Sequence, residues 1–151
     1  MIIDYDKYSL ILDNKRVFIN CAAFHYFRCP GVDTWRDRLS KIKACGYNTV
    51  DLYFCWDYHS KKQGVYDFTG IKDIRALLDL AAELGLFVIA RPGPFINAEL
   101  SLGGLPKWLL NIPDVYIRNK KDGDFFYSEP YMKALKEWYS RIIPIINEYH
   151  N

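Results

Sequence analysis

Two polar side chains, Asn97 and Glu99, follow a stretch of the chain whose composition stiffens the backbone. Residues 91–108 read RPGPFINAELSLGGLPKW, so that Arg91 and two prolines precede the polar pair. A carboxylate and a carboxamide held close together can accept hydrogen bonds from neighbouring hydroxyl groups and donate to them at fixed angles. This chemistry suits the recognition of a sugar. Spacing alone leaves open that Glu99 caps a short helix near Leu105 or pairs with Arg91.

The polar segment follows an apolar run that has the character of a strand. Residues 86–90, LFVIA, form a short and partly β-branched run after Gly85, which is typical of a buried parallel strand. Folds of the α/β class place ligands just beyond the carboxyl ends of such strands. We therefore expect a binding site where this strand ends.

Strand and helix patterns alternate along the rest of the chain. Residues 8–12 and 16–20 flank a turn and predict an N-terminal hairpin, and residues 21–24 and 49–54 predict two more strands. A helix should begin at Asp33 or Thr34 and end at Gly46.

Further helices are expected over residues 74–84, over the short stretch 105–110, and after Ser128 with Pro130 in the first turn. Residues 56–59 are expected in a loop, and residues 111–127 in a polar connection. The βα repeat predicts a parallel sheet with right-handed crossovers.

Composition narrows the class of protein. The 151 residues are half hydrophobic and a quarter charged, which suffices for one globular domain. The net charge is +2 with both signs well mixed, so no basic patch points to nucleic acid or to a membrane surface. The sequence shows neither a signal peptide nor an apolar run of membrane-spanning length, which predicts a cytoplasmic protein.

No metal or other cofactor is expected, because the cysteines and histidines lack metal-ligand spacing. His25, His59 and His150 are each expected to be structural or exposed. The four cysteines are expected to be reduced and buried small hydrophobes. They are Cys21, Cys29, Cys45 and Cys55.

Two aromatic residues carry weaker signals for a sugar site. Tyr53 ends the strand at residues 49–54 on its polar face, although a tyrosine in this position belongs to a core more often than to a ligand site. Trp56 could stack on a sugar ring or close the top of the structure.

Glycoside hydrolysis needs two carboxyl groups across the bond that is cleaved, about 5–5.5 Å apart in a retaining enzyme. Glu99 is one candidate. Asp51 lies too deep in its strand and Asp57 lies in a loop, so neither makes a convincing partner. The chain does not supply a convincing pair.

Several motifs follow one another along nearly the whole chain in the order and spacing of one known family. They are FHYFR at 24–28, WRDRL at 35–39, KIKA at 41–44, GYNTV at 46–50, Tyr53, Trp56, RPGPFINAE at 91–99, GGLP at 103–106 and WL at 108–109. In these motifs the chain resembles glycoside hydrolase family 35, the β-galactosidase family.

The resemblance implies an α/β fold, namely the N-terminal portion, about three βα units, of a (β/α)₈ TIM barrel preceded by the β-hairpin. Residues 1–151 would then be a partial catalytic domain. It also implies a retaining enzyme that removes terminal β-galactosyl groups, with Tyr53, Asn97, Ala98 and Glu99 matching positions that bind the terminal sugar. In that scheme Glu99 is a sugar ligand and not the proton donor.

The family's acid/base glutamate lies in an Asn-Glu pair after a fourth strand, and its nucleophile lies on a later strand. Asn147 and Glu148 are not that pair, since they belong to the last helix. The chain has His59-Ser60-Lys61 where the family commonly has His-Glu-Pro, and Leu100 where many members have tryptophan. These departures concern the rim of the site and the preference for the aglycone.

The leading interpretation is therefore the sugar-binding part of a β-galactosidase-like hydrolase that lacks both catalytic glutamates in this chain. Its expected partners are a galactoside or related carbohydrate and the missing C-terminal part of the barrel, with no nucleic acid and no membrane. The alternatives are a non-catalytic carbohydrate-binding or interaction remnant and a glycosidase of different specificity, such as an exo-glucosaminidase.

Overall fold

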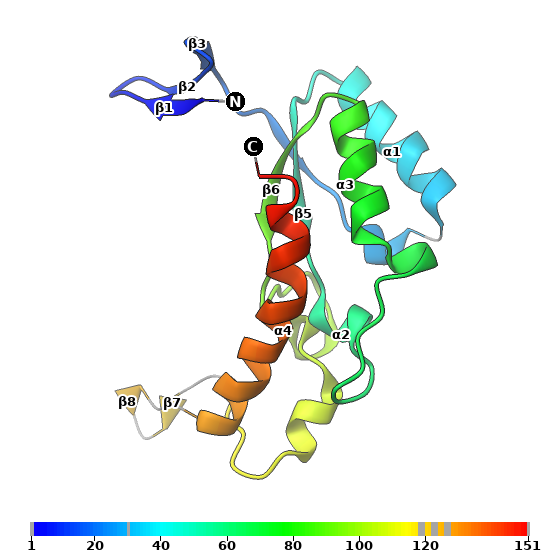
Figure 1. Ribbon diagram of the computed structural model, residues 1–151, viewed down its shortest axis with the longest axis vertical. Helices are drawn as coiled ribbons and strands as arrows, with labels where there is room; N and C mark the ends of the chain where they lie inside the picture. The colour runs from blue at the N-terminus through cyan, green and yellow to red at the C-terminus, as the bar shows by residue number, and fades with distance from the viewer. Residues whose placement is uncertain (1, 30, 118–119, 122–123, 126–127, 151) are drawn as a thin grey trace.

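A three-stranded parallel sheet forms the centre of the protein in the computed structural model, which has a mixed α/β fold (Figure 1). The structure describes residues 2–29, 31–117, 120–121, 124–125 and 128–150. The sheet consists of β4 (Cys21–Ala23), β5 (Thr49–Tyr53) and β6 (Phe87–Arg91), in that order. β5 pairs in parallel with both neighbours, so the three carboxyl ends lie at one edge.

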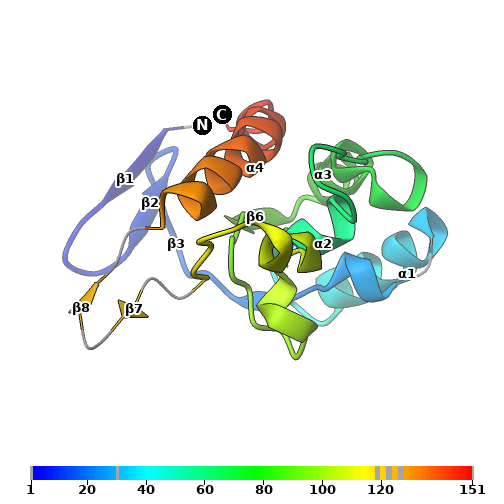
Figure 2. The ribbon, with the colours of Figure 1, turned by 90° about the horizontal axis from the view of Figure 1, so that it is seen from below.

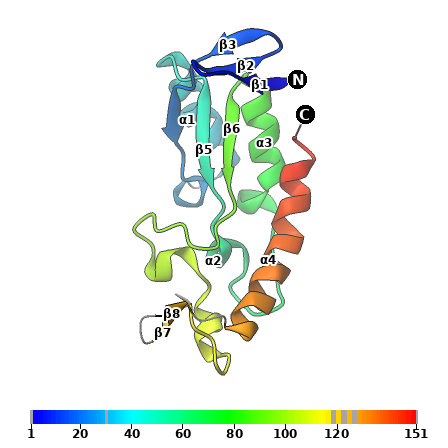
Figure 3. The same ribbon diagram turned by 90° about the vertical axis from the view of Figure 1, so that its left-hand side faces the viewer.

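Two amphipathic helices cover one face of this sheet. They are α1 (Val32–Ala44) and α3 (Ile74–Glu83), and they lie behind the strands in Figure 3. The alternation along β5 turns Val50 and Leu52 toward them, and both side chains are fully buried. The Asp73 carboxylate caps α3 by accepting a hydrogen bond of 3.1 Å from the Ala76 amide.

The expected start of α1 at Asp33 or Thr34 is wrong. The N-cap is Gly31, whose φ of 89° turns the chain into the helix two residues earlier. The Thr34 hydroxyl then lies inside the first turn and donates to the Gly31 carbonyl at 2.7 Å.

The connections at the carboxyl ends of the strands contain short helical turns. The 3₁₀ helix η1 (Tyr26–Arg28) follows β4, and α2 (Trp56–His59) follows β5 where a loop was expected. Two α-helical hydrogen bonds form α2, from the His59 amide to the Cys55 carbonyl at 3.4 Å and from the Ser60 amide to the Trp56 carbonyl at 2.9 Å.

Further 3₁₀ helices are η2 (Gly70–Lys72), η3 (Ser101–Gly104) and η4 (Lys107–Asn111), the last of which replaces the short helix expected at 105–110. β7 (Lys120–Lys121) and β8 (Asp124–Phe125) form an antiparallel pair.

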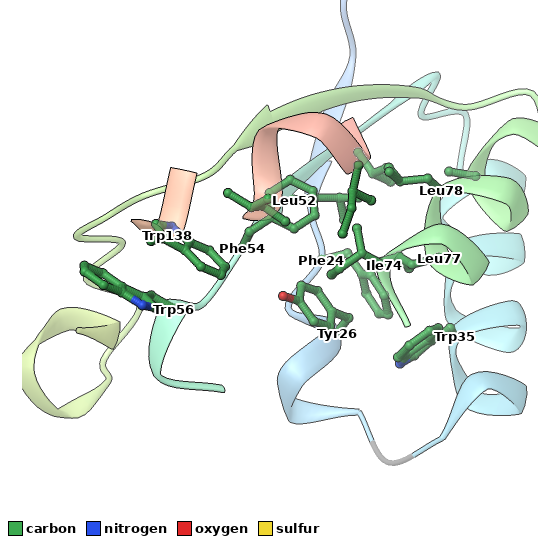
Figure 4. Packing of buried hydrophobic residues seen from close by; sticks show 14 of the residues in the cluster. Phe24, Tyr26, Trp35, Leu52, Phe54, Trp56, Ile74, Leu77, Leu78 and Trp138 are labelled. Carbon is green, nitrogen blue, oxygen red and sulfur yellow. The ribbon is translucent and has the colours of Figure 1, made fainter. Parts of the chain in front are cut away.

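The last helix, α4 (Glu129–Asn147), begins as predicted after Ser128, whose hydroxyl accepts a hydrogen bond from the Tyr131 amide. Its buried Trp138 stacks on Trp56 with ring centroids 5.9 Å apart, and both indoles belong to the aromatic core shown in Figure 4. The Trp138 indole also donates to the Pro92 carbonyl at 2.8 Å, and the Tyr139 hydroxyl donates to the Gly93 carbonyl at 2.8 Å. α4 thereby holds the segment that follows β6.

The N-terminal residues form a separate antiparallel sheet of β1 (Ile3–Tyr5), β2 (Leu10–Leu12) and β3 (Lys15–Val17). β2 and β3 lie within or beside the segments expected to form a hairpin, and β1 is an additional strand. This sheet and α1 lie at opposite sides of the molecule (Figure 2).

The second face of the parallel sheet is open toward the viewer in Figure 3. Phe87 and Ile89 lie on this face and are 37% and 42% exposed, and among the described residues β6 pairs only with β5. An apolar cavity of about 480 Å³ lies beside β6, between the N-terminal sheet and the end of α4. In the part of the chain that the structure describes, every helix is too short or too polar to cross a membrane.

We predict that the purified chain self-associates, because an unpaired strand edge beside exposed apolar side chains favours pairing with another chain. The Ile89→Lys substitution should shift the mass measured by light scattering toward that of the monomer. Val65→Lys is the matched control, since Val65 is also exposed but lies in a turn away from β6. A monomer at all concentrations, with one sharp thermal transition, would contradict the prediction.

Candidate functional site

Three loops meet at the carboxyl edge of the parallel sheet and form the candidate site. They are η1 after β4, α2 after β5, and residues 92–105 after β6. Because the strands end side by side, residues far apart in the sequence come into contact. The Arg28 guanidinium, for example, donates a hydrogen bond to the carbonyl of Ala98, 70 residues away.

Arg91 joins the ends of β5 and β6. Its register partner is Tyr53, and the guanidinium donates to the Tyr53 hydroxyl at 2.5 Å while its carbon lies 4.2 Å from the centre of the tyrosine ring. The same nitrogen, Nη1, donates to Asp51 Oδ2 at 3.2 Å. Arg91 therefore fixes the orientation of the Tyr53 ring and hydroxyl, and it does not pair with Glu99 as one alternative had suggested.

The backbone of Asn97, Ala98 and Glu99 is left-handed, with φ values of 56°, 50° and 51°. For non-glycine residues this conformation costs roughly 1–2 kcal/mol each, and such strain is concentrated at functional sites. The turn is closed by a hydrogen bond of 3.0 Å from the Leu100 amide to the Asn97 carbonyl.

Two glycines allow the segment to fold back on itself. A β-carbon at Gly103 would lie 2.0 Å from the Phe95 ring, and one at Gly104 would lie 2.8 Å from the Ile96 side chain. The Ile96 amide donates to the Gly103 carbonyl at 2.9 Å. The two glycines of the GGLP motif thus allow close packing against residues 95–96, and Ile96 in turn packs in one cluster with Ala98 of the left-handed turn.

The turn presents its three side chains differently. Asn97 and Glu99 are exposed, whereas the Ala98 methyl is buried against Cys55 and Ile96. The Glu99 side chain is 81% exposed, and its Oε2 lies 3.6 Å from Arg28 Nη2. The polar groups of Asn97 and Glu99 are available to a ligand, while Ala98 anchors the turn.

His25 and Arg28 are site residues that the sequence argument did not single out. The His25 ring stacks on Phe27 and meets the edge of Tyr53, with ring centroids 5.3 Å apart in both contacts. Burial, and then the Arg28 charge, lower the pKa of His25, which favours a neutral ring beside Tyr53. The sequence signal that could have identified His25 and Arg28 is their position directly after a predicted parallel strand.

Trp56 does not face the site. Its side chain is fully buried between Trp108 and Trp138, so it belongs to the core. The expectation of four buried cysteines is also wrong, because Cys45 is exposed and Cys55 alone is buried among the four free thiols. Cys45 follows the amphipathic helix α1 at its C-cap, where the chain returns to the surface.

A buried pair, Tyr26 and His59, links the first two loops. The Tyr26 hydroxyl lies 2.6 Å from His59 Nε2, and His59 Nδ1 lies 2.8 Å from the Asp67 carbonyl. A carbonyl only accepts, so Nδ1 carries the proton and Nε2 accepts from the tyrosine. Burial lowers the pKa of His59 to about 4, which keeps the ring neutral.

The carboxylates near the site are engaged by cations. Asp51 binds Arg91 and Asp57 pairs with Lys61, so neither is placed as an unpaired partner of Glu99. Among the described residues, no group of three or more histidine, cysteine or acidic side chains is arranged to hold a metal ion.

Comparisons with known proteins agree on one family. The sequence model of "Glycosyl hydrolases family 35" matches residues 9–151. The "Exo-beta-D-glucosaminidase" of Pyrococcus horikoshii is 37% identical, over 99% of this chain and 21% of that protein. "Beta-galactosidase-1-like protein 2" of Homo sapiens is 40% identical, over 94% and 24%, and "Beta-galactosidase-1-like protein 3" of Mus musculus is 41% identical, over 93% and 20%. The chain spans about a fifth to a quarter of the length of these relatives.

We predict that acid weakens the fold through His59. A buried histidine with a lowered pKa stabilises the native state above its unfolded pKa of 6.5, and this contribution is lost as the pH falls toward 4. The loss from this group should be about 3 kcal/mol between pH 7 and pH 4. Denaturant unfolding at several pH values measures the loss, and the NMR titration of the ring measures the pKa. A ring that titrates near 6.5 in the folded protein would contradict the prediction.

Proposed function

The chain belongs to glycosyl hydrolase family 35, and we propose on this basis that it forms the galactose-contacting part of a retaining β-galactosidase. In this proposal Tyr53, Asn97 and Glu99 contact the terminal β-galactosyl group, and Ala98 between the last two positions them. The observation that carries the proposal is the left-handed turn at residues 97–99, which exposes a carboxamide and a carboxylate, while Tyr53 packs against the small cluster that contains Ala98.

The polar groups of the site match what a sugar requires. Glu99 accepts hydrogen bonds from hydroxyls, Asn97 can both donate and accept, and the Tyr53 hydroxyl can donate because Arg91 already supplies it with a donor. A turn braced by Arg28 and by the two glycines keeps these groups at fixed positions. Fixed donors and acceptors distinguish one sugar epimer from another because an axial and an equatorial hydroxyl point in different directions.

Ala98 contributes in a different way from its neighbours. Its methyl is buried and its carbonyl accepts from Arg28, so the side chain offers no polar contact to a ligand. We assign it the role of holding Asn97 and Glu99 apart on the outer side of the turn.

Glu99 serves as a sugar ligand in this proposal and not as the general acid. Its side chain is 81% exposed beside Arg28, unlike the apolar enclosure that keeps a glycosidase carboxyl group protonated. The carboxylates of Asp51 and Asp57 are bound by Arg91 and Lys61. The acid/base and the nucleophile are therefore assigned to residues that this chain does not contain.

The Asn147-Glu148 pair does not supply the acid. Both residues lie at the end of α4, and the Glu148 carboxylate accepts from the Arg75 guanidinium of α3 at 2.7 Å. The open sheet face, with Phe87 and Ile89 exposed, is proposed to be covered by further βα units of the barrel.

A second candidate specificity is exo-glucosaminidase. A relative with that printed name is 37% identical over nearly the whole chain, and its substrate carries an amine that a carboxylate could bind. Parallel assays with galactosides and glucosaminides separate the two.

We predict that the isolated chain does not turn over an aryl β-galactoside or an aryl β-glucosaminide. Without a general acid and a nucleophile, the transition state lacks both proton transfer and covalent stabilisation. Release of the aryl group from the purified chain should match that of the Glu99→Gln variant. Turnover that Glu99→Gln abolishes would show that the chain carries its own catalytic groups, and it would refute the non-catalytic assignment.

We also predict that Glu99→Gln weakens binding of methyl β-galactoside about tenfold, because a charge-assisted hydrogen bond contributes roughly 1.5–3 kcal/mol and this one is exposed. Tyr53→Phe should weaken binding less, since it removes one hydroxyl. Asp57→Asn is the control and should leave binding unchanged. Isothermal titration calorimetry measures all three. If Asp57→Asn removed binding and Glu99→Gln did not, the sugar would lie at α2 instead of at the turn.

A further inference from the structure

A second cavity lies directly beside the left-handed turn, outside the contacts proposed for galactose. Its volume is about 390 Å³, within the range of small-ligand pockets. All three loops at the carboxyl edge line it: Arg28 comes from η1, Lys61 follows α2, and Ser101 and Lys107 follow β6. Leu100, the residue after Glu99, forms part of its wall, so the cavity adjoins the left-handed turn of the proposed sugar site.

The lining of this cavity is unusually positive. Its ten residues include three cations, Arg28, Lys61 and Lys107, and one carboxylate, Asp57, which gives a net charge of +2. The whole chain of 151 residues carries the same net charge. Asp57 pairs with Lys61, and Arg28 is near Glu99, whereas no ion pair of Lys107 occurs among the described residues. The excess of positive charge is therefore local to the cavity.

The remaining walls are uncharged and partly aromatic. Phe27 and Tyr58 line the cavity together with Leu100, and apolar walls of this kind strengthen the field of the cations. Burial raises the pKa of the Cys55 thiol to about 11, so this lining residue adds no negative charge. The cavity thus offers ring surfaces and cations and holds no anion of its own except the paired Asp57.

From this charge and lining we propose that the cavity is a subsite for a negatively charged sugar unit, a uronic acid or a sulfated sugar, which adjoins the galactosyl group in the substrate. The inference rests on the proposed function and specifies the aglycone side of the same site. The sugar ring lies against Phe27 and Tyr58, and its carboxylate or sulfate is bound by Lys107 and Lys61. A neutral sugar would leave Lys107 without an ion pair among the described residues.

The test uses the full chain and three probes at low ionic strength. Methyl β-glucuronide and glucose 6-sulfate should bind about tenfold more tightly than neutral methyl β-glucoside, and salt should reduce this preference. NMR amide shifts should change at Ser101 and Lys107. The two anionic probes distinguish a carboxylate ligand from a sulfate ligand.

Three variants locate the effect. Lys107→Gln should weaken binding of the anionic sugar about three- to fivefold. Lys136→Gln, which removes the same charge from the exposed side of α4, should leave it unchanged. Asp57→Asn removes the one carboxylate of the lining and should strengthen binding of the anionic sugar.

Equal affinity for the charged and the neutral sugar would overturn the inference. Inorganic sulfate that binds as tightly as glucose 6-sulfate would also overturn it, since the cavity would then recognise an ion and not a sugar. The galactoside titration in the same protein separates the two proposals. A chain that binds methyl β-galactoside yet shows no preference for the acid retains the proposed function and refutes this subsite.

Discussion

The buried hydrogen bond between the Tyr26 hydroxyl and His59 Nε2 is the contact on which the arrangement of the three loops depends. It joins the loop after β4 to the loop after β5, and the His59 ring stacks in turn on Phe68 and Trp138. Trp138 holds the third loop through the Pro92 carbonyl. Loss of either partner would leave a buried polar group unpaired, which costs about 1–3 kcal/mol, and would loosen all three loops together.

The geometry of the site depends on backbone strain as well as on the packing of these aromatic residues. Three consecutive left-handed residues at 97–99 are stable only because their surroundings hold them: Arg28 binds the Ala98 carbonyl, and Gly103 leaves room for the Phe95 ring. The left-handed backbone costs stability, but it orients the Asn97 and Glu99 side chains outward and holds them on a rigid turn. Recognition of a sugar by hydrogen bonds requires such rigidity, since loosely held groups lose their directional preference.

The proposed sugar site and the neighbouring cavity at the carboxyl edge differ in charge. Arg91 is neutralised by Asp51 and is used to orient Tyr53, so this part of the edge presents hydroxyl, amide and carboxylate groups. The neighbouring cavity carries an excess of lysine and arginine. The same three loops thus create a polar surface of fixed geometry and a positive surface beside it, and the open sheet face remains apolar.

The sequence by itself determined the strands of the parallel sheet, the helices α1, α3 and α4, and their order, because apolar runs and helical periodicity are local properties. It did not determine α2 or β1. It also singled out Asn97 and Glu99, since the prolines before them restrict the backbone wherever they occur. The partners of those residues were decided only by the tertiary structure. Arg28 reaches Ala98, and Arg91 turns to Tyr53 and not to Glu99, because parallel strands bring distant loops together. Trp56 likewise belongs to the core because Trp138 of α4 packs against it, and no local pattern around Trp56 predicts this contact.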